Sequence, residues 1–165
     1  VALSEPSPVK GLVLIGGHPG LTSVAQREER LALDHERASR LESEGLAAFL
    51  QAWYELPLFG SLRDRSDFHA RLESRLCRDP DAVSCTLRRL STGHQADLRP
   101  LLSSLSLPIH WVYGAEDSRY AAIYNALGDH PHWRRHAVPE AAHSVHIEQP
   151  TRVAEILRVA TAAIV

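Results

Sequence analysis

The chain has 165 residues, with 18 Lys or Arg against 20 Asp or Glu, so its formal net charge at neutral pH is −2. A chain of this length is expected to form one domain with a core of its own. The near-neutral charge gives no sign of a basic surface for nucleic acids or anionic membranes. No apolar run approaches the roughly 20 residues of a membrane span, and the first residues lack a signal-peptide layout. We therefore expect a soluble, cytoplasmic protein with no nucleic-acid or membrane partner.

The first segment predicts part of a parallel sheet. Val1 to Leu3 fit the tail of a helix, and a loop follows. Val9 to Ile15 then form a short apolar run bounded by Pro8 and Gly16. An apolar run without alternation is typical of a strand buried on both faces of a sheet.

Residues 22–103 have a charged sequence with apolar residues at helical spacing. Ser23 and Gln26 fit a capping box that opens a first helix, and Gly45 fits its end. Three more helices are predicted from the following residues: Leu46, Phe49, Leu50 and Trp53 before Pro57; Phe68, Leu72 and Leu76 before Asp79; Val83, Leu87 and Leu90 before Gly93. We therefore expect a helical segment inserted after the first strand.

The two cysteines, Cys77 and Cys85, are expected to be free thiols. In one continuous helix they would lie about 12 Å apart at 1.5 Å per residue. A disulfide requires Cα atoms within roughly 7 Å of one another. Free thiols suit a reducing cytoplasm.

The last third of the chain again alternates strands and helices. Strands are predicted at 109–113 and near 133–138, with a helix at about 119–127 between them. A closing amphipathic helix carries Val153, Ile156, Leu157 and Ala160. This alternation indicates a parallel α/β sheet. The predicted organisation is a core segment at 1–21, a helical cap at 22–103, and a second core segment with the closing helix at 104–165.

Ligands of an open parallel sheet bind beyond the carboxyl ends of its strands. Asp117 follows the second predicted strand, and His143 lies in the loop after the third. This is the chain order of the last two members of a Ser-Asp-His triad, in which the Asp orients the His that takes the proton. The alternative is structural, because an Asp after a strand often caps a helix and a loop His is often exposed.

The loop Gly16–Gly20 reads Gly-Gly-His-Pro-Gly and follows the first strand. It could supply oxyanion-hole amides, but that role would require a nucleophile elbow downstream, and none follows. The Walker spacing of a phosphate loop is absent too. We expect this loop to shape the floor of the site.

No Gly-x-Ser-x-Gly nucleophile elbow occurs in the sequence. In this architecture the elbow precedes the Asp, on the turn before the helix expected at Val1 to Leu3. We therefore expect the chain to be a fragment whose serine lies upstream. A metal site is not expected, because the candidate histidines lack the usual ligand register and cysteine support: His130, His132, His136, His143 and His146.

Several segments resemble one family, the 2-succinyl-6-hydroxy-2,4-cyclohexadiene-1-carboxylate synthases, which are lyases of α/β-hydrolase fold in menaquinone and phylloquinone biosynthesis. They are Gly16–Leu21 (GGHPGL), Gln26–Arg30 (QREER), Trp53–Phe59 (WYELPLF), Gly114–Ser118 (GAEDS) and His143–Pro150 (HSVHIEQP). The resemblance covers essentially the whole chain, but only the C-terminal two-thirds or so of the family's length. The Asp117 and His143 segments are shared by α/β-hydrolases in general. The Gly16–Leu21 loop and the two segments of the helical cap occur in a much narrower set of proteins.

The resemblance implies an α/β-hydrolase fold and a role for five residues. Asp117 would be the triad acid and His143 its base, Arg30 would bind a substrate carboxylate, and Trp53 with Phe59 would line the pocket. A guanidinium offers a two-pronged donor to a carboxylate. Without the resemblance, Arg30 would be a solvated charge on a helix, and Trp53 would be core of the helical segment.

The implied reaction is elimination of pyruvate from 2-succinyl-5-enolpyruvyl-6-hydroxy-3-cyclohexene-1-carboxylate, and the expected partner is a small-molecule dicarboxylate. The serine activated by His143 would act as the base, and no metal or organic cofactor is required. This chain alone should be inactive because it lacks the serine. Two alternatives remain: a fragment of a general α/β-hydrolase that cleaves esters or C–C bonds, and a non-catalytic half-protein that needs a partner chain.

Overall fold

The computed structural model describes residues 8–162. The helix tail predicted at Val1 to Leu3 lies outside the described residues. Two compact units make up the structure: a sheet unit of residues 8–18 with 99–162, and a helical unit of residues 19–98. The boundaries predicted from the sequence, after residues 21 and 103, lie a few residues beyond these.

The sheet has three parallel strands in the order β1-β2-β3. They span Leu12–Ile15, Ile109–Gly114 and Trp133–Val138. All six residues of β2 are buried, as expected of a central strand. The expectation that the first strand is buried on both faces is wrong, because all four residues of β1 are half-buried. Among the described residues β1 is an edge strand with only β2 beside it.

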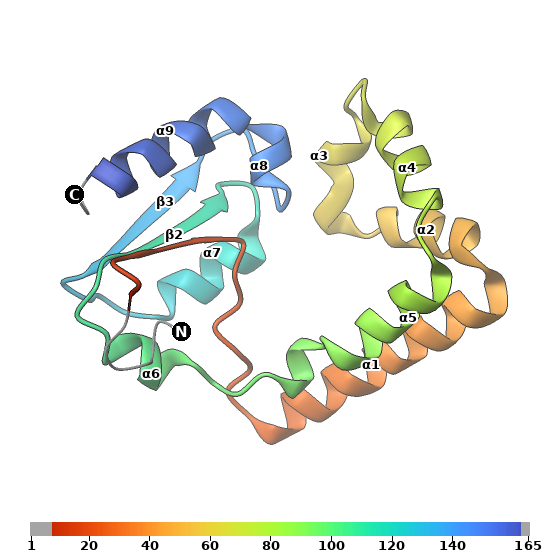
Figure 1. Cartoon of the computed structure of the whole chain (residues 1–165), viewed down its shortest axis with the longest axis horizontal. Helices are drawn as coiled ribbons and strands as arrows, with labels where there is room; N and C mark the ends of the chain where they lie inside the picture. Colours follow the sequence, from red (N-terminus) through yellow and green to blue (C-terminus); the bar gives the residue numbers. More distant parts are fainter. Residues whose placement is uncertain (1–7, 163–165) are drawn as a thin grey trace. The chain divides into compact units, whose positions relative to one another are not determined.

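One helix covers each face of this sheet (Figure 1). Odd-numbered residues of β2, such as Trp111, pack against Tyr124 of α7 (Ser118–Asn125). Even-numbered residues, such as Val112, lie in a second cluster with Val153 of α9 (Pro150–Ala162). The alternation follows from the two-residue period of a strand. Because β2 and β3 are parallel neighbours, their carboxyl ends lie together between α7 and α9.

The sequence predicted the two longer helices of the sheet unit, α7 and α9, but not its two short ones. The structure adds α6 (Arg99–Ser103) before β2 and α8 (Val145–Glu148) after β3. Both are too short to show a helical repeat in the sequence. Leu157 of the closing helix is exposed rather than part of the core.

The helical unit begins with the long helix α1 (Val24–Glu44). The predicted capping box is confirmed: the amide of Gln26 donates to Oγ of Ser23 at 3.1 Å, and the amide of Ser23 donates to Oε1 of Gln26 at 3.2 Å. The helix ends at Gly45, whose φ of 84° suits a residue without a side chain. The ends of α1 are therefore specified locally by the sequence.

Shorter helices and turns make up the rest of this unit. They are α2 (Leu46–Tyr54), a 3₁₀ turn (Pro57–Phe59), α3 (Gly60–Arg63), α4 (Phe68–Leu76), α5 (Pro80–Arg89) and a second 3₁₀ turn (Thr92–His94). Their core is a cluster of Leu41, Leu46, Phe49 and Leu50. Figure 1 shows α1 and α5 side by side, and Arg88 of α5 pairs with Glu42 of α1 at 2.8 Å.

Two expectations about α5 are wrong. The helix ends at Arg89 rather than near Gly93, and Leu90 is 78% exposed. Gly93 has a packing role instead, since a Cβ there would lie 2.6 Å from the carbonyl oxygen of Arg27 in α1. Cys77 and Cys85 are free thiols as predicted, but they belong to different helical segments, so the spacing argument does not apply.

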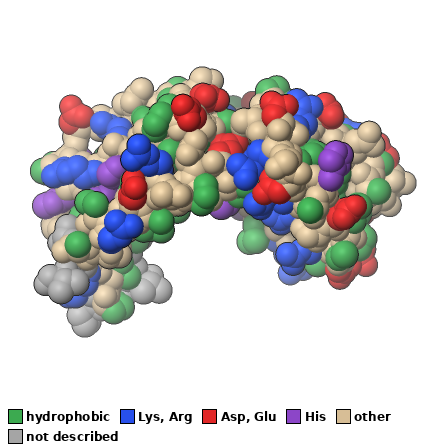
Figure 2. Space-filling model, turned by 90° about the horizontal axis from the view of Figure 1, so that it is seen from above, with side chains coloured by type: hydrophobic (Ala, Val, Ile, Leu, Met, Phe, Trp, Pro, Cys, Tyr) green, Lys and Arg blue, Asp and Glu red, His purple; other side chains and the backbone are tan. Residues whose placement is uncertain are grey.

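No helix within residues 8–162 is long and apolar enough to cross a membrane. On the face drawn in Figure 2, acidic and basic side chains are interspersed rather than gathered into a field of one sign. This mixture agrees with the small net charge of the chain.

Candidate active site

Asp117 and His143 meet at the carboxyl end of β2. Oδ2 of Asp117 lies 2.9 Å from Nδ1 of His143. Oδ1 of the same carboxylate accepts a hydrogen bond from the amide of Tyr120 at 3.0 Å and so caps α7. The structural and catalytic explanations of Asp117 are therefore compatible, since each uses a different oxygen. Asp117 is only 8% exposed, whereas the side chain of His143 is half-buried.

The loop that carries His143 is held against the end of β2. A Cβ at Gly114 would run into the carbonyl oxygens of Ala141 and Ala142, so only glycine fits there. The amide of Glu116 donates to the oxygen of Ala141 at 2.9 Å. Backbone contacts of this kind fix the position from which His143 reaches Asp117.

Glu148 is a further support of this loop that sequence reasoning missed. Its Oε2 accepts a hydrogen bond from the amide of Ala142 at 2.6 Å. Glu148 lies in α8, five residues after His143, and the two belong to one motif of the sequence. The spacing shows that they are near one another, but it does not reveal that the carboxylate binds a backbone amide.

The loop after β1 lies beside the imidazole. A Cβ at Gly16, whose φ is +59°, would be 3.9 Å from Cε1 of His143. The hydroxyl of Tyr124 donates to the carbonyl oxygen of Gly17 at 2.8 Å and ties this loop to α7. The ring of Tyr120, which the sequence did not single out, lies 4.9 Å from the ring of His143. This placement is consistent with the expected role of the loop as a floor of the site.

The surroundings of Asp117 favour its charged form. Burial acts to raise its pKa, but the hydrogen bonds from His143 and from the Tyr120 amide outweigh it and hold the pKa below the ordinary value of 3.8. An ionised carboxylate at this position accepts from Nδ1–H of the imidazole. Nε2, on the other side of the ring, then has the lone pair that a general base needs.

The lowered pKa of Asp117 predicts a pH-dependent contribution to stability. A carboxyl with a depressed folded-state pKa stabilises the fold above its unfolded pKa, and that stabilisation is lost as pH falls through the folded pKa. We expect the free energy of unfolding of the unmodified chain to exceed that of Asp117→Asn more at about pH 5 than at about pH 2.5. Urea unfolding of both proteins at the two pH values checks this. A difference that stays constant or grows on acidification would contradict the pairing.

Arg30 lies in α1 of the helical unit and is not a simple solvated charge. Its Nε donates to Oδ2 of Asp34, one turn further along α1, at 2.6 Å. The Arg30 side chain is 28% exposed, and Asp34 is buried. The guanidinium is therefore held by a buried partner instead of moving freely in solvent.

Trp53 and Phe59 lie together in the same unit. Their ring centroids are 6.0 Å apart, and Phe49 stacks on Trp53 at 5.7 Å. Trp53 packs at the margin of the helical core and is half-buried. Trp53 therefore contributes to the packing of the helical unit, and its role in lining a substrate pocket stays a prediction.

The remaining candidates form no metal site in the described part of the chain. Within residues 8–162, no group of three or more His, Cys, Asp or Glu is placed to hold a metal ion. A hydrogen bond of 2.9 Å joins His136 to His110 on the neighbouring strand.

Comparisons with known proteins identify relatives of this chain. No protein-family model matches the chain. It is 34% identical to the 2-succinyl-6-hydroxy-2,4-cyclohexadiene-1-carboxylate synthase of Enterobacter sp. strain 638 over 94% of its length, and 35% identical to that of Escherichia coli O1:K1 over 95%. This chain is a homologue of these synthases. It spans about three fifths of their length, 58% and 62%, which fits a match to their C-terminal portion.

Solved structures establish the fold of this synthase homologue. MenH from Staphylococcus aureus superposes with a TM-score of 0.88 at 24% identity, over 94% of this chain and 60% of MenH. A thermophilic esterase from Thermogutta terrifontis gives 0.71 at 22% identity, over 94% of this chain and 56% of the esterase. The chain has the C-terminal part of an α/β-hydrolase fold, as the sequence predicted.

Proposed function

We propose that this chain is the C-terminal portion of a lyase of menaquinone biosynthesis, which eliminates pyruvate from 2-succinyl-5-enolpyruvyl-6-hydroxy-3-cyclohexene-1-carboxylate. Asp117 and His143 are two members of its triad, and the serine lies outside the 165 residues. The observation that carries the proposal is the 2.9 Å contact between Asp117 and His143 in a homologue of the synthases. This substrate has a third carboxylate, on its enolpyruvyl group, so the expectation of a dicarboxylate applies to the ring that remains after pyruvate has left. The expected compartment is the cytoplasm.

In the proposed mechanism His143 acts first as a general base and then as a general acid. Nε2 of His143 takes the serine hydroxyl proton as the serine oxygen takes the proton from C2 of the ring, the carbon that carries the succinyl group. The C2–H electron pair forms the C2=C3 bond, the C3=C4 pair moves to C4=C5, and the C5–O bond breaks. His143 returns its proton to the departing enolpyruvate, which becomes pyruvate. Asp117 stabilises the imidazolium while it exists.

The helical unit contributes binding in this proposal. Arg30 binds a carboxylate of the substrate, because a guanidinium can donate two parallel hydrogen bonds to it. Trp53 and Phe59 contact the apolar part of the ring. No step of this scheme uses a metal or an organic cofactor.

A substrate panel tests the proposal. The protein to be tested contains this chain together with the residues encoded upstream of Val1. We expect release of pyruvate from the cyclohexene substrate and little hydrolysis of p-nitrophenyl esters. Ester hydrolysis without pyruvate release would instead favour a general hydrolase, for which the likeness to the esterase is the supporting observation.

The chain by itself gives a second, independent result. We expect it to release no pyruvate, because it has no nucleophile elbow. If it is a half-protein that needs a partner, it should associate strongly or precipitate when made alone. Measuring its size by light scattering separates these cases, and a stable monomer counts against the half-protein.

A further inference from the structure

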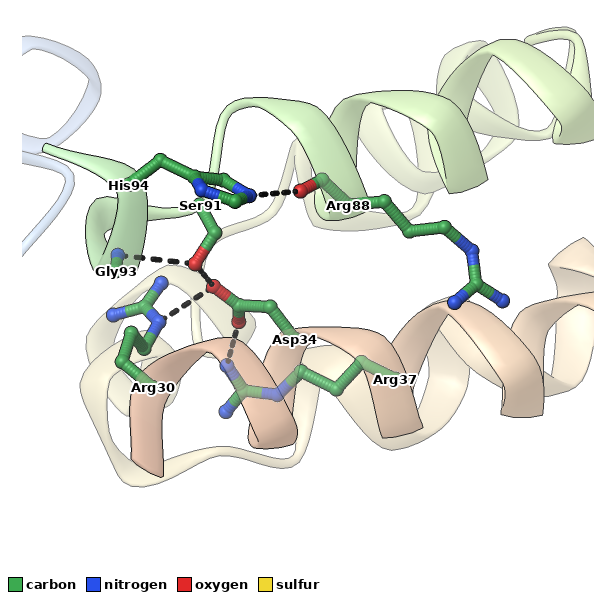
Figure 3. Close-up of polar contacts among 7 residues, drawn as sticks. All are labelled: Arg30, Asp34, Arg37, Arg88, Ser91, Gly93 and His94. Carbon is green, nitrogen blue, oxygen red and sulfur yellow. Dashed lines mark hydrogen bonds and ion pairs between the residues drawn. The ribbon is translucent and has the colours of Figure 1, made fainter. Parts of the chain in front are cut away.

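A buried carboxylate in α1 holds two arginines at once (Figure 3). Asp34 is only 2% exposed. Its Oδ2 accepts from Nε of Arg30 at 2.6 Å, and its Oδ1 accepts from a terminal nitrogen of Arg37 at 3.0 Å. One buried charge therefore fixes two guanidinium groups on the same side of the helix.

Asp34 is itself fixed by a distant segment. The hydroxyl of Ser91, which follows α5, donates to Oδ2 of Asp34 at 2.8 Å. The Ser91 oxygen in turn accepts from the amide of Gly93 at 3.1 Å, so the hydroxyl proton points at Asp34. Burial acts to raise the pKa of Asp34, but the hydrogen bonds from Arg30 and Ser91 outweigh it and leave that pKa lowered. The carboxylate is thus charged and held in one orientation.

The two arginines keep donors that Asp34 does not use. Arg30 contributes only Nε, and Arg37 contributes only one terminal nitrogen. Within residues 8–162, the buried side-chain nitrogen and oxygen atoms that lack a hydrogen-bond partner are the indole nitrogens of Trp111 and Trp133. No guanidinium nitrogen of Arg30 or Arg37 is among them, so the nitrogens that Asp34 does not bind are accessible to solvent. Both arginine side chains are about a quarter exposed.

A second contact places Arg37 beside the aromatic residues of the proposed site. Its Cζ lies 5.1 Å from the centroid of the Trp53 ring, in cation–π contact. Arg40, three residues further along α1, differs from Arg37 in this respect. Two of its nitrogens, Nε and a terminal one, bind both oxygens of the exposed Glu44 at 3.1 Å. Arg40 has its own acidic partner, whereas Arg30 and Arg37 share one.

We propose that Asp34 is a positioning residue that holds Arg30 and Arg37 as a paired receptor for a dicarboxylate, with Arg37 as the second carboxylate-binding residue. This inference rests on the proposed function, because it assigns the ring and succinyl carboxylates, the two that remain on the product after pyruvate has left. The trio has an excess of one positive charge, so it attracts an anion even though Asp34 is negative. Asp34 also binds only one nitrogen of each guanidinium, which leaves the other donors for the ligand.

The experiment measures binding of a stable probe to the 165-residue chain by isothermal titration calorimetry. The probe is 2-succinylbenzoate, an aromatic dicarboxylate with the carbon skeleton of the expected product. The comparison compound is 4-oxo-4-phenylbutanoate, which lacks the ring carboxylate. We expect the chain to bind the dicarboxylate at least tenfold more tightly than the monocarboxylate.

Asp34→Asn distinguishes positioning from simple charge. The change adds one unit of positive charge, so without a positioning role the affinity for the dicarboxylate would rise or stay the same. We expect it to fall at least tenfold, because the two guanidinium groups lose their shared anchor. Glu44→Gln removes the partner of Arg40 on the same helix and is the matched control, with an expected change below twofold.

Two further variants keep the test decisive if Asp34→Asn unfolds in circular dichroism. Arg37→Lys preserves charge but removes the planar fork, and it should abolish the preference for the dicarboxylate over the monocarboxylate. Ser91→Ala preserves Asp34 but frees its carboxylate, and it should weaken dicarboxylate binding severalfold. An unchanged preference in Arg37→Lys, or equal binding of both probes by the unmodified chain, would overturn the inference.

The lyase assay separates this inference from the proposed function. If pyruvate is released by the longer protein and Asp34→Asn has an unchanged KM, the inference is wrong and the lyase remains. If the chain binds the dicarboxylate in the expected Asp34-dependent way but no pyruvate is released, the receptor remains and the lyase is wrong.

Discussion

Replacing His143 with alanine is expected to lower the rate of pyruvate release by about 10²–10⁴-fold, the usual contribution of a positioned acid–base group. Without the imidazole, the serine has no acceptor for its proton. Asp117→Asn should cause a loss in the same range, because an amide favours the wrong tautomer of His143 and does not stabilise the imidazolium. The measurement is kcat of the protein that contains this chain and the upstream residues.

The control for these variants is His132→Ala, a change at an exposed histidine of the sheet unit. It should leave kcat within about twofold, as expected of a surface substitution. The double variant of Asp117 and His143 should be little worse than His143→Ala alone, since the two act as one unit. Losses that simply multiply would mean that Asp117 acts on the reaction without His143.

Gly114→Ala is expected to have the largest effect on the structure of the site. The added Cβ would overlap the carbonyl oxygens of Ala141 and Ala142, which are backbone atoms and yield only if the loop moves. Overpacking of this kind costs about 1–3 kcal/mol of folding stability. Because the same loop carries His143, its movement should also break the contact with Asp117. Urea unfolding and the imidazole NMR signals of His143 measure the two effects.

The matched control is Gly60→Ala at the start of α3. Nothing lies within 4 Å of a Cβ at Gly60, and its φ of −53° suits any residue. This variant should be neutral or slightly more stable, because alanine favours the helix. If Gly114→Ala behaved like Gly60→Ala, the loop would be more adaptable than its close contact with β2 indicates.

Local signals in the sequence predicted most of the elements. Ser23 and Gln26 are three residues apart and form their capping box without help from the rest of the chain. The apolar run at Ile109 predicted the central strand because burial on both faces leaves a continuous apolar sequence. Asp117 and His143 could be chosen as a pair because parallel strands bring their carboxyl ends to one edge.

Interactions between distant segments could not be predicted in the same way. Asp34 and Ser91 are 57 residues apart, and Asp34 is surrounded in sequence by other charges, so nothing marked it as buried. Gly93 looked like a helix stop, although its lack of a side chain serves packing against α1. Leu12–Ile15 looked buried on both faces because composition does not tell an edge strand from a central one.

The most direct test of a serine-dependent triad is to sequence the gene upstream of the codon for Val1 and to measure the intact mass of the native protein. We expect roughly 80–100 additional residues that include a Gly-x-Ser-x-Gly turn just before Val1, which would complete the triad in the chain order of the fold. A native protein whose mass shows that it begins at Val1 would contradict the proposal that Asp117 and His143 act with a serine of the same chain.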